Sequence, residues 1–202
     1  LGVIVAAILA VGAFVIFTGD KSDSSQLTDF DYSIGQKLGS DEAPVKIVEF
    51  GDFQCPACAT AAENYEKIYL QNPDKVQLIF RHFPLTEIHR NAYSSSQAAE
   101  AASKQGKFWE MYRVLYINQS SWSELSDPLG FYVEAAKQIG LDEDQFRKDY
   151  TSDEVKQAIN QDSDYAEKVG INQTPTFYVN GERYLGTRSI EDWQQAVDAA
   201  LK

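Results

Sequence analysis

The pattern of apolar and polar positions divides the chain into three parts. Residues 1–17 (LGVIVAAILAVGAFVIF) carry no charged or strongly polar side chain. Residues 18–39 are rich in Asp, Ser, Gly and Gln without sustained periodicity, as is typical of a flexible tether. From residue 40 to residue 202, runs with strand and helix periodicity follow one another. The pattern therefore predicts one folded domain, residues 40–202, behind a polar tether and an apolar N-terminal segment.

The first half of the predicted domain has the pattern of a β-α-β unit. Residues 45–50 (VKIVEF) and 76–80 (VQLIF) are short runs of apolar and β-branched residues, which favour strands. Between them, Pro56 precedes an alanine-rich stretch that predicts a helix with proline in its first turn, ending at Asn72-Pro73. Strand, helix and strand in this order imply a right-handed crossover and a parallel strand pair.

The second half has the pattern of a β-β-α unit. Residues 88–170 carry helical periodicity and predict a helical insertion, which ends with two short acidic helices. Residues 176–179 (TFYV) return to a strand, and the Asn-Gly pair that follows predicts a hairpin with residues 183–185. A capping box at Ser189 opens the last helix. The fold class is thus α/β, with both units around a central mixed sheet.

The N-terminal segment, residues 1–17, is typical of membrane targeting. It begins without a Met or a basic flank, so we expect it to be part of a longer segment able to span about 30 Å of hydrocarbon. An uncleaved single-pass anchor is the prediction; a signal peptide cleaved near residues 10–12, where small residues flank Val11, is the alternative. In both cases the domain is extracytoplasmic, on the side where disulfides persist.

Composition and charge narrow the classes of partner. The hydrophobic content of 44% is enough to bury a core, so the chain is not expected to be disordered as a whole. A formal net charge of -12 repels phosphates, which argues against nucleic acid and anionic lipid headgroups as partners of a broad surface.

The cysteine content is the strongest chemical signal. The chain has 2 cysteines, Cys55 and Cys58, in the sequence Cys-Pro-Ala-Cys. A small fold stapled by disulfides would carry several cysteines at wide spacing. A bridge that closes so short a loop constrains the unfolded chain little, so stability is a poor reason for the pair. The spacing therefore favours redox chemistry.

A metal site is the alternative use of a Cys-x-x-Cys pair. Structural zinc takes four ligands, and such pairs commonly come in twos. Only His82 and His89 remain as nitrogen donors, and we expect both to serve packing or the surface. We therefore predict no metal and no cofactor; a copper or zinc carrier would need tight stoichiometric metal at the reduced pair.

The position of Cys55 at a helix start predicts its reactivity. Unpaired N–H groups and the helix dipole stabilise negative charge there, so the pKa of Cys55 should fall. A stabilised thiolate favours the reduced pair, and such a protein donates its disulfide to others. Cys58, one turn further along, is expected to be more buried and to act as the resolving thiol.

The chain resembles the DsbA-type branch of the thioredoxin superfamily over residues 39–202. The resemblance is carried by four segments in the family's order: EFGDFQCPAC, RHFPL, GKFWEM and GINQTPTFYVNG. It implies a thioredoxin fold in which Cys55 attacks substrate sulfur through a mixed disulfide. It also implies that Pro175 is a cis-proline beside the cysteines, and that the backbone at Thr174 and Pro175 binds an extended substrate.

A third residue carried over from the resemblance is Glu49, where the family has a buried acid beneath the cysteine pair. With a raised pKa, its carboxyl group could relay a proton as Cys58 is released. The alternative is a solvent-facing Glu49 on an edge strand. The dipeptide Pro56-Ala57 lacks the histidine of strongly oxidising members, and Thr174 occurs in both oxidising and isomerising relatives.

Together these observations predict a monomeric thiol-disulfide oxidoreductase that introduces disulfides into reduced exported proteins. By resemblance, a membrane partner of the DsbB or vitamin K epoxide reductase type would reoxidise it. Two rivals stay open. One is a reductase or isomerase supplied with electrons from the cytoplasm, although the dimerisation domain that isomerases usually add would not fit between residue 17 and residue 39. The other is a chaperone or binding module in which the cysteines are incidental.

Overall fold

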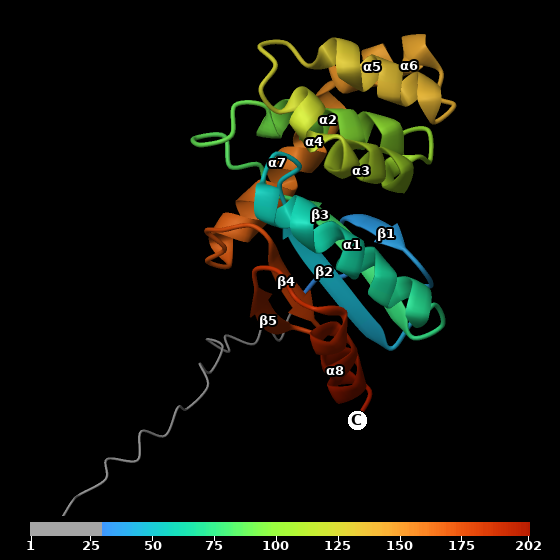
Figure 1. Cartoon of the computed structure of the whole chain (residues 1–202), viewed down its shortest axis with the longest axis vertical. Helices are drawn as coiled ribbons and strands as arrows, with labels where there is room; N and C mark the ends of the chain where they lie inside the picture. The colour runs from blue at the N-terminus through green and yellow to red at the C-terminus, as the bar shows by residue number, and fades with distance from the viewer. Residues whose placement is uncertain (1–29) are drawn as a thin grey trace, which may run out of the picture.

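The computed structural model describes residues 30–202; the apolar segment and most of the tether lie outside the described residues. A five-stranded mixed sheet runs through the centre of the domain (Figure 1). Its strands lie in the order β1-β3-β2-β4-β5, with bounds Gln36–Leu38 (β1), Val45–Gly51 (β2), Val76–His82 (β3), Thr176–Val179 (β4) and Glu182–Leu185 (β5).

The strand pairing confirms both predicted units. β2 pairs with β3 in parallel and with β4 in an antiparallel register, so β2 is a central strand. β4 and β5 form the predicted hairpin. Asn180 and Gly181 turn it with φ of 46° and 88°, in the left-handed region that Asn and Gly tolerate best.

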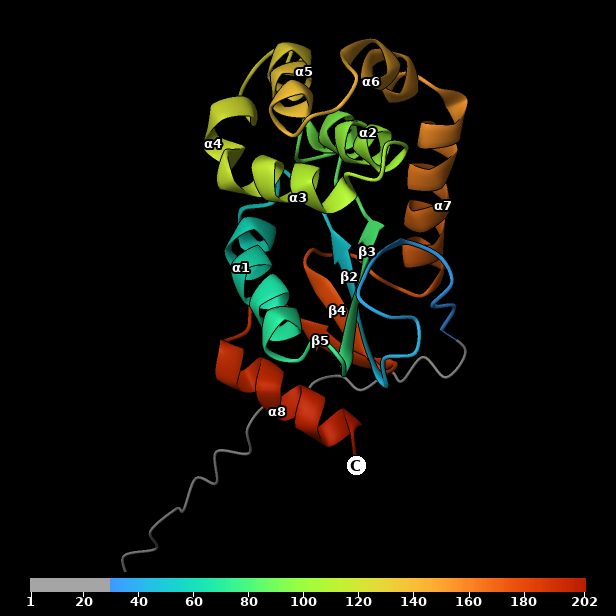
Figure 2. The ribbon, with the colours of Figure 1, turned by 90° about the vertical axis from the view of Figure 1, so that its right-hand side faces the viewer.

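The helices lie on both faces and at one end of the sheet. Their bounds are Pro56–Gln71 (α1), Ala92–Ser103 (α2), Phe108–Ile117 (α3), Gln119–Trp122 (α4), Leu129–Gln138 (α5), Glu143–Tyr150 (α6), Asp153–Lys168 (α7) and Ile190–Ala200 (α8). Figure 2 shows α1 and α8 on one face, α7 on the other, and α2 to α6 gathered at one end. Of the two helices predicted to be short, α7 is long, with 16 residues.

Alternation along β2 divides the core into two layers. Ile47 belongs to the larger cluster, which α1, α3 and α8 cover, whereas Val48 and Phe50 belong to the smaller cluster beneath α7. Because side chains on a strand alternate between faces, Glu49 shares the face of Ile47. A carboxyl group is thereby placed inside the larger apolar layer.

The folded domain begins earlier than the pattern predicted. The tether was expected to extend to residue 39, but β1 pairs with β3, and Phe30 packs against Phe50 and Tyr178. A three-residue strand has no readable periodicity, and its pairing with β3 joins positions far apart in the chain. Within residues 30–202, no helix is both long and apolar enough to cross a membrane.

Candidate active site

Cys55 and Cys58 lie at the start of α1, next to the carboxyl end of β2. Cys55 is the N-cap residue of α1, and Pro56 occupies the first turn, where its missing N–H costs nothing. Cys55 keeps 7% of its surface exposed and Cys58 keeps 0%. Both are free thiols in the structure. Only Cys55 therefore presents sulfur to an incoming protein.

The pKa of Cys55 is lowered to about 5, chiefly by a hydrogen bond from the Cys58 thiol. Burial opposes this shift, while the Thr174 hydroxyl and the backbone N–H groups of Cys58 and Ala57 add to it. The N–H contribution is the effect of the helix start that the sequence predicted. The two side-chain donors were not predicted, because one depends on the rotamer of Cys58 and the other on a distant loop.

Cys58 has the opposite character. Burial raises the pKa of Cys58 well above the ordinary value of a cysteine, and the neighbouring Cys55 and Glu49 raise it further. One thiol of the pair is thus an anion near neutral pH, and the other holds its proton. This asymmetry suits an exposed attacking and leaving sulfur beside a buried sulfur that closes the ring.

The loop before β4 brings the predicted substrate-binding residues to the nucleophile. The Thr174–Pro175 peptide bond is cis. The Sγ atom of Cys55 lies 3.5 Å from the carbonyl oxygen of Thr174, to which the protonated thiol donates. The loop is held by Gly186, whose N–H donates to the carbonyl oxygen of Pro175 at 3.0 Å.

Glu49 is buried beneath the pair, with 0% of its surface exposed. It lies opposite Phe80 of β3 and Phe177 of β4, so the alternative of a solvent-facing residue on an edge strand is wrong. Tyr112 of α3 donates to its Oε2 at 3.2 Å, and Oε1 has no hydrogen-bond partner among the described residues. Burial raises the pKa of Glu49 to about 8, which the charges of Cys55 and Glu66 reinforce.

Asp52 organises the loop between β2 and α1, a role that the sequence did not reveal. Its Oδ1 accepts the N–H of Gln54 at 2.7 Å, and its Oδ2 accepts the N–H of Leu85 at 3.0 Å. Its carbonyl oxygen accepts the N–H of Cys55 at 3.1 Å. One buried acid thus fixes the approach to the nucleophile; Asp following Gly after a strand is too common a pattern to predict this.

Within the described residues, neither histidine hydrogen-bonds to a cysteine sulfur. His82 is buried, with Nε2 3.2 Å from Glu100, and His89 lies with Nδ1 2.7 Å from Asp52 Oδ2. Each makes a structural contact, as expected for packing residues. Within residues 30–202, no cluster of three or more histidine, cysteine or acidic side chains could hold a metal ion.

Comparison with known proteins gives the family of the chain. A family model described as thioredoxin matches residues 34–199. The chain belongs to the thioredoxin family. Within that family, it is 35% identical over 208 residues to a probable disulfide bond formation protein D from Bacillus cereus, across 98% of this chain and 93% of the relative.

Solved structures show a matching fold. A thioredoxin-like oxidoreductase from Silicibacter pomeroyi matches with a TM-score of 0.70 and 30% identity, over 82% of this chain and 91% of that one. The thiol-disulfide exchange protein alpha-DsbA2 from Wolbachia pipientis matches with a TM-score of 0.72 and 23% identity, over 85% and 89%. The DsbA-like resemblance and the thioredoxin fold are confirmed, and the chain is a thiol-disulfide oxidoreductase.

Proposed function

We propose that this oxidoreductase works as a dithiol oxidase that gives its Cys55–Cys58 disulfide to other proteins. The observation that carries the proposal is the opposite shift of the two thiol pKa values. Stabilising the Cys55 thiolate stabilises the reduced pair relative to the disulfide. A protein whose reduced form is stabilised is an oxidant towards ordinary protein thiols.

The reaction proceeds in two exchanges. A substrate thiolate attacks Sγ of Cys55, the bond between Cys55 and Cys58 breaks, and the Cys58 sulfur leaves and takes up a proton. A second thiolate of the same substrate then attacks the substrate sulfur that is bonded to Cys55. The substrate disulfide forms, and Cys55 leaves as a thiolate. Two electrons pass from the substrate to the cysteine pair.

Glu49 serves the first exchange as a proton donor. The leaving Cys58 sulfur is buried, and a negative charge on a buried sulfur costs free energy because it is removed from water. With its pKa raised to about 8 by burial, Glu49 holds a proton near neutral pH and can deliver it to Cys58, directly or through water. In reoxidation the same carboxylate takes the proton back.

The loop at Thr174 and Pro175 binds the substrate chain. The carbonyl oxygen of Thr174 lies against the Cys55 sulfur. A substrate segment that pairs with this loop therefore places its own cysteine beside Cys55. Backbone pairing recognises an extended chain without reading its sequence, which suits an enzyme with many substrates.

The setting of the enzyme is extracytoplasmic. Residues 1–17 anchor it to the membrane, or are removed as a signal peptide, and the tether holds a monomeric domain near the bilayer. Reduced exported proteins are the substrates. A membrane reoxidase of the DsbB or vitamin K epoxide reductase type restores the disulfide.

The test is the redox equilibrium of the cysteine pair against glutathione. The proposal predicts a reduction potential far above the value of about −270 mV typical of thioredoxin. A potential close to thioredoxin's would make the chain a reductase. Disulfide transfer to a reduced model protein that survives Cys55→Ser would remove Cys55 from the nucleophile role, and chaperone activity that survives it would favour a binding module.

A further inference from the structure

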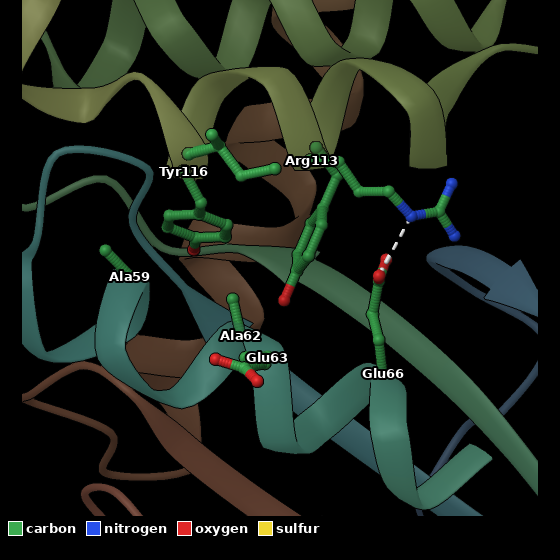
Figure 3. Close-up of a pocket in the computed structure, with 8 residues that line it drawn as sticks. Ala59, Ala62, Glu63, Glu66, Arg113 and Tyr116 are labelled. Carbon is green, nitrogen blue, oxygen red and sulfur yellow. Dashed lines mark hydrogen bonds and ion pairs between the residues drawn. The ribbon is translucent and has the colours of Figure 1, made fainter. Parts of the chain in front are cut away.

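A pocket opens between α1 and α3, on the side of α1 that covers Glu49. Its volume is about 340 Å³, and Glu63 and Glu66 of α1 and Tyr112 and Arg113 of α3 contribute to its wall. Figure 3 shows Glu66 directed towards Arg113 across the gap between the two helices. A liquid water molecule occupies about 30 Å³, so the pocket has room for several.

Tyr112 connects this pocket to the buried acid. The residue lines the pocket, and its hydroxyl donates to Glu49 Oε2 at 3.2 Å. A tyrosine hydroxyl both donates and accepts hydrogen bonds. It can therefore accept a proton on one side, release its own proton on the other, and then rotate about its C–O bond. The pocket therefore ends one hydroxyl group away from Glu49.

Glu66 lies at the outer end of the same path. Its Oε2 accepts from Arg113 Nε at 2.9 Å, and its side chain is 17% exposed. Its Oε1 is buried and has no partner within the described part of the chain, and the same holds for Glu49 Oε1. Two carboxyl groups at the two ends of one path thus each keep an oxygen free for water.

We propose that this pocket is the proton route of the active site, and that Glu66 is the outer carboxylate that exchanges protons between Glu49 and solvent. The proposal rests on the proposed role of Glu49 as the group that gives a proton to Cys58 and takes it back. Burial raises the pKa of Glu66 against the lowering effect of Arg113, which brings its titration closer to that of Glu49.

The step is clearest during reoxidation by glutathione disulfide. The Cys55 thiolate attacks the glutathione disulfide, and a glutathione thiolate leaves. Cys58 then loses its proton to Glu49, its sulfur attacks Cys55, and the second glutathione leaves as the Cys55–Cys58 bond forms. Because Glu49 holds a proton near neutral pH, that proton must first pass through the Tyr112 hydroxyl or pocket water to Glu66 and bulk solvent before Glu49 can accept the proton of Cys58.

The ionisable groups around this path come from three elements. β2 contributes Glu49 itself. From α1 and its N-cap residue, the cysteines, Tyr65 and Glu66 interact with it, and from α3, Tyr112 and Tyr116 do so. Arg113 is the cation that faces Glu66. Glu63 also lines the pocket but is exposed, so Glu49 and Glu66 are the buried and half-buried carboxyl groups of the path and the proton carriers that a change of pH would reveal.

The test compares Glu66→Gln with Glu63→Gln, a matched control that lines the same pocket but is exposed. Reduced protein is mixed with glutathione disulfide, quenched with acid, and analysed by mass spectrometry for the glutathione adduct and its disappearance. E66Q should slow ring closure on the order of tenfold, less than a group in direct contact with the sulfur would. E63Q should close at the rate of the unmodified protein.

Two further readouts separate proton transfer from altered structure. The closure rate of E66Q should rise with the concentration of a small buffer such as imidazole, and E66D should restore most of the rate without it. Closure of E66Q at the unmodified rate, or slow closure that no buffer concentration restores, would overturn the proposal.

Glu49→Gln tells the two proposals apart. If ring closure is slow in E49Q but not in E66Q, Glu49 keeps its proposed role in proton transfer to and from Cys58, and the pocket is not the proton route. If E49Q closes at the unmodified rate, the proposed proton role of Glu49 fails, and the route falls with it.

Discussion

The sulfur of Cys55 lies 3.5 Å from the carbonyl oxygen of Thr174, 119 residues further along the chain. The helix start and the loop before β4 are therefore one site, in which the residue before Pro175 also influences the nucleophile. The Thr174 hydroxyl is buried and makes no hydrogen bond among residues 30–202, so it is free to donate to the Cys55 thiolate, and it helps to lower the pKa of Cys55.

The first prediction concerns this hydroxyl. Thr174→Val keeps the shape of the side chain and removes the donor, so the pKa of Cys55 should rise and the reduction potential should fall. Thiolate absorbance as a function of pH measures the pKa, and equilibration with glutathione measures the potential. Thr174→Ser is the control, since it keeps the hydroxyl. Equal pKa values in the valine and serine variants would contradict the role of the hydroxyl.

The second prediction concerns the ion pair beneath α7. Arg81 is fully buried, and its Nε donates to Asp162 Oδ1 at 2.7 Å. Asp162→Asn leaves the guanidinium without a compensating charge, so the free energy of unfolding should fall by about 3 kcal/mol. Urea denaturation measures the loss.

The matched control for the ion pair is Glu143→Gln, which breaks the exposed pair with Arg147. An exposed pair contributes little, so this change should cost no more than about 0.5 kcal/mol. Equal losses of stability in the two variants would show that breaking the buried Arg81–Asp162 pair costs no more than breaking an exposed pair.

The local elements of the fold could be predicted from sequence, because their signals are local. Pro56 at a helix start, the Asn180-Gly181 turn and the Ser189 capping box each act within a few residues, and each is present. The edge strand β1 was missed because only its pairing with β3 makes it a strand.

The site could be predicted only in part, because only some of its features depend on residues close together in sequence. The position of Cys55 at a helix start follows from its neighbours in sequence. The surroundings of Glu49 do not, because they depend on β2 lying between β3 and β4 and on Tyr112, 63 residues away. Glu66 and its pocket carry no sequence signal, since an acidic residue on an exposed helix is common.

The third prediction concerns the pH dependence of stability at Glu49. Burial raises its pKa from 4.5 to about 8, so between these values the folded protein keeps a proton that the unfolded chain loses. The contribution of Glu49 to the free energy of unfolding therefore falls as pH rises, by about 1.4 kcal/mol per pH unit. Glu49→Gln should remove this loss while keeping an acceptor for Tyr112.

The measurement is urea denaturation of the reduced protein at several pH values, with and without the substitution. The Cys55 thiolate acts in the opposite direction but is present in both proteins, so most of its effect cancels in the difference. The stability of E49Q relative to the unmodified protein should increase steadily from about pH 4.5 to about pH 8. A difference that does not change with pH would mean that Glu49 titrates alike in the folded and unfolded states.

The most direct test is a titration of Cys55 in the reduced protein. Thiolate absorbance, or the rate of alkylation, is followed against pH with Cys58→Ala as a companion variant. The hydrogen bond from Cys58, the Thr174 hydroxyl and the helix start predict a pKa of about 5, and a higher value in the variant that lacks the Cys58 donor. A pKa near the value of about 8.5 for free cysteine would contradict the proposed oxidase function.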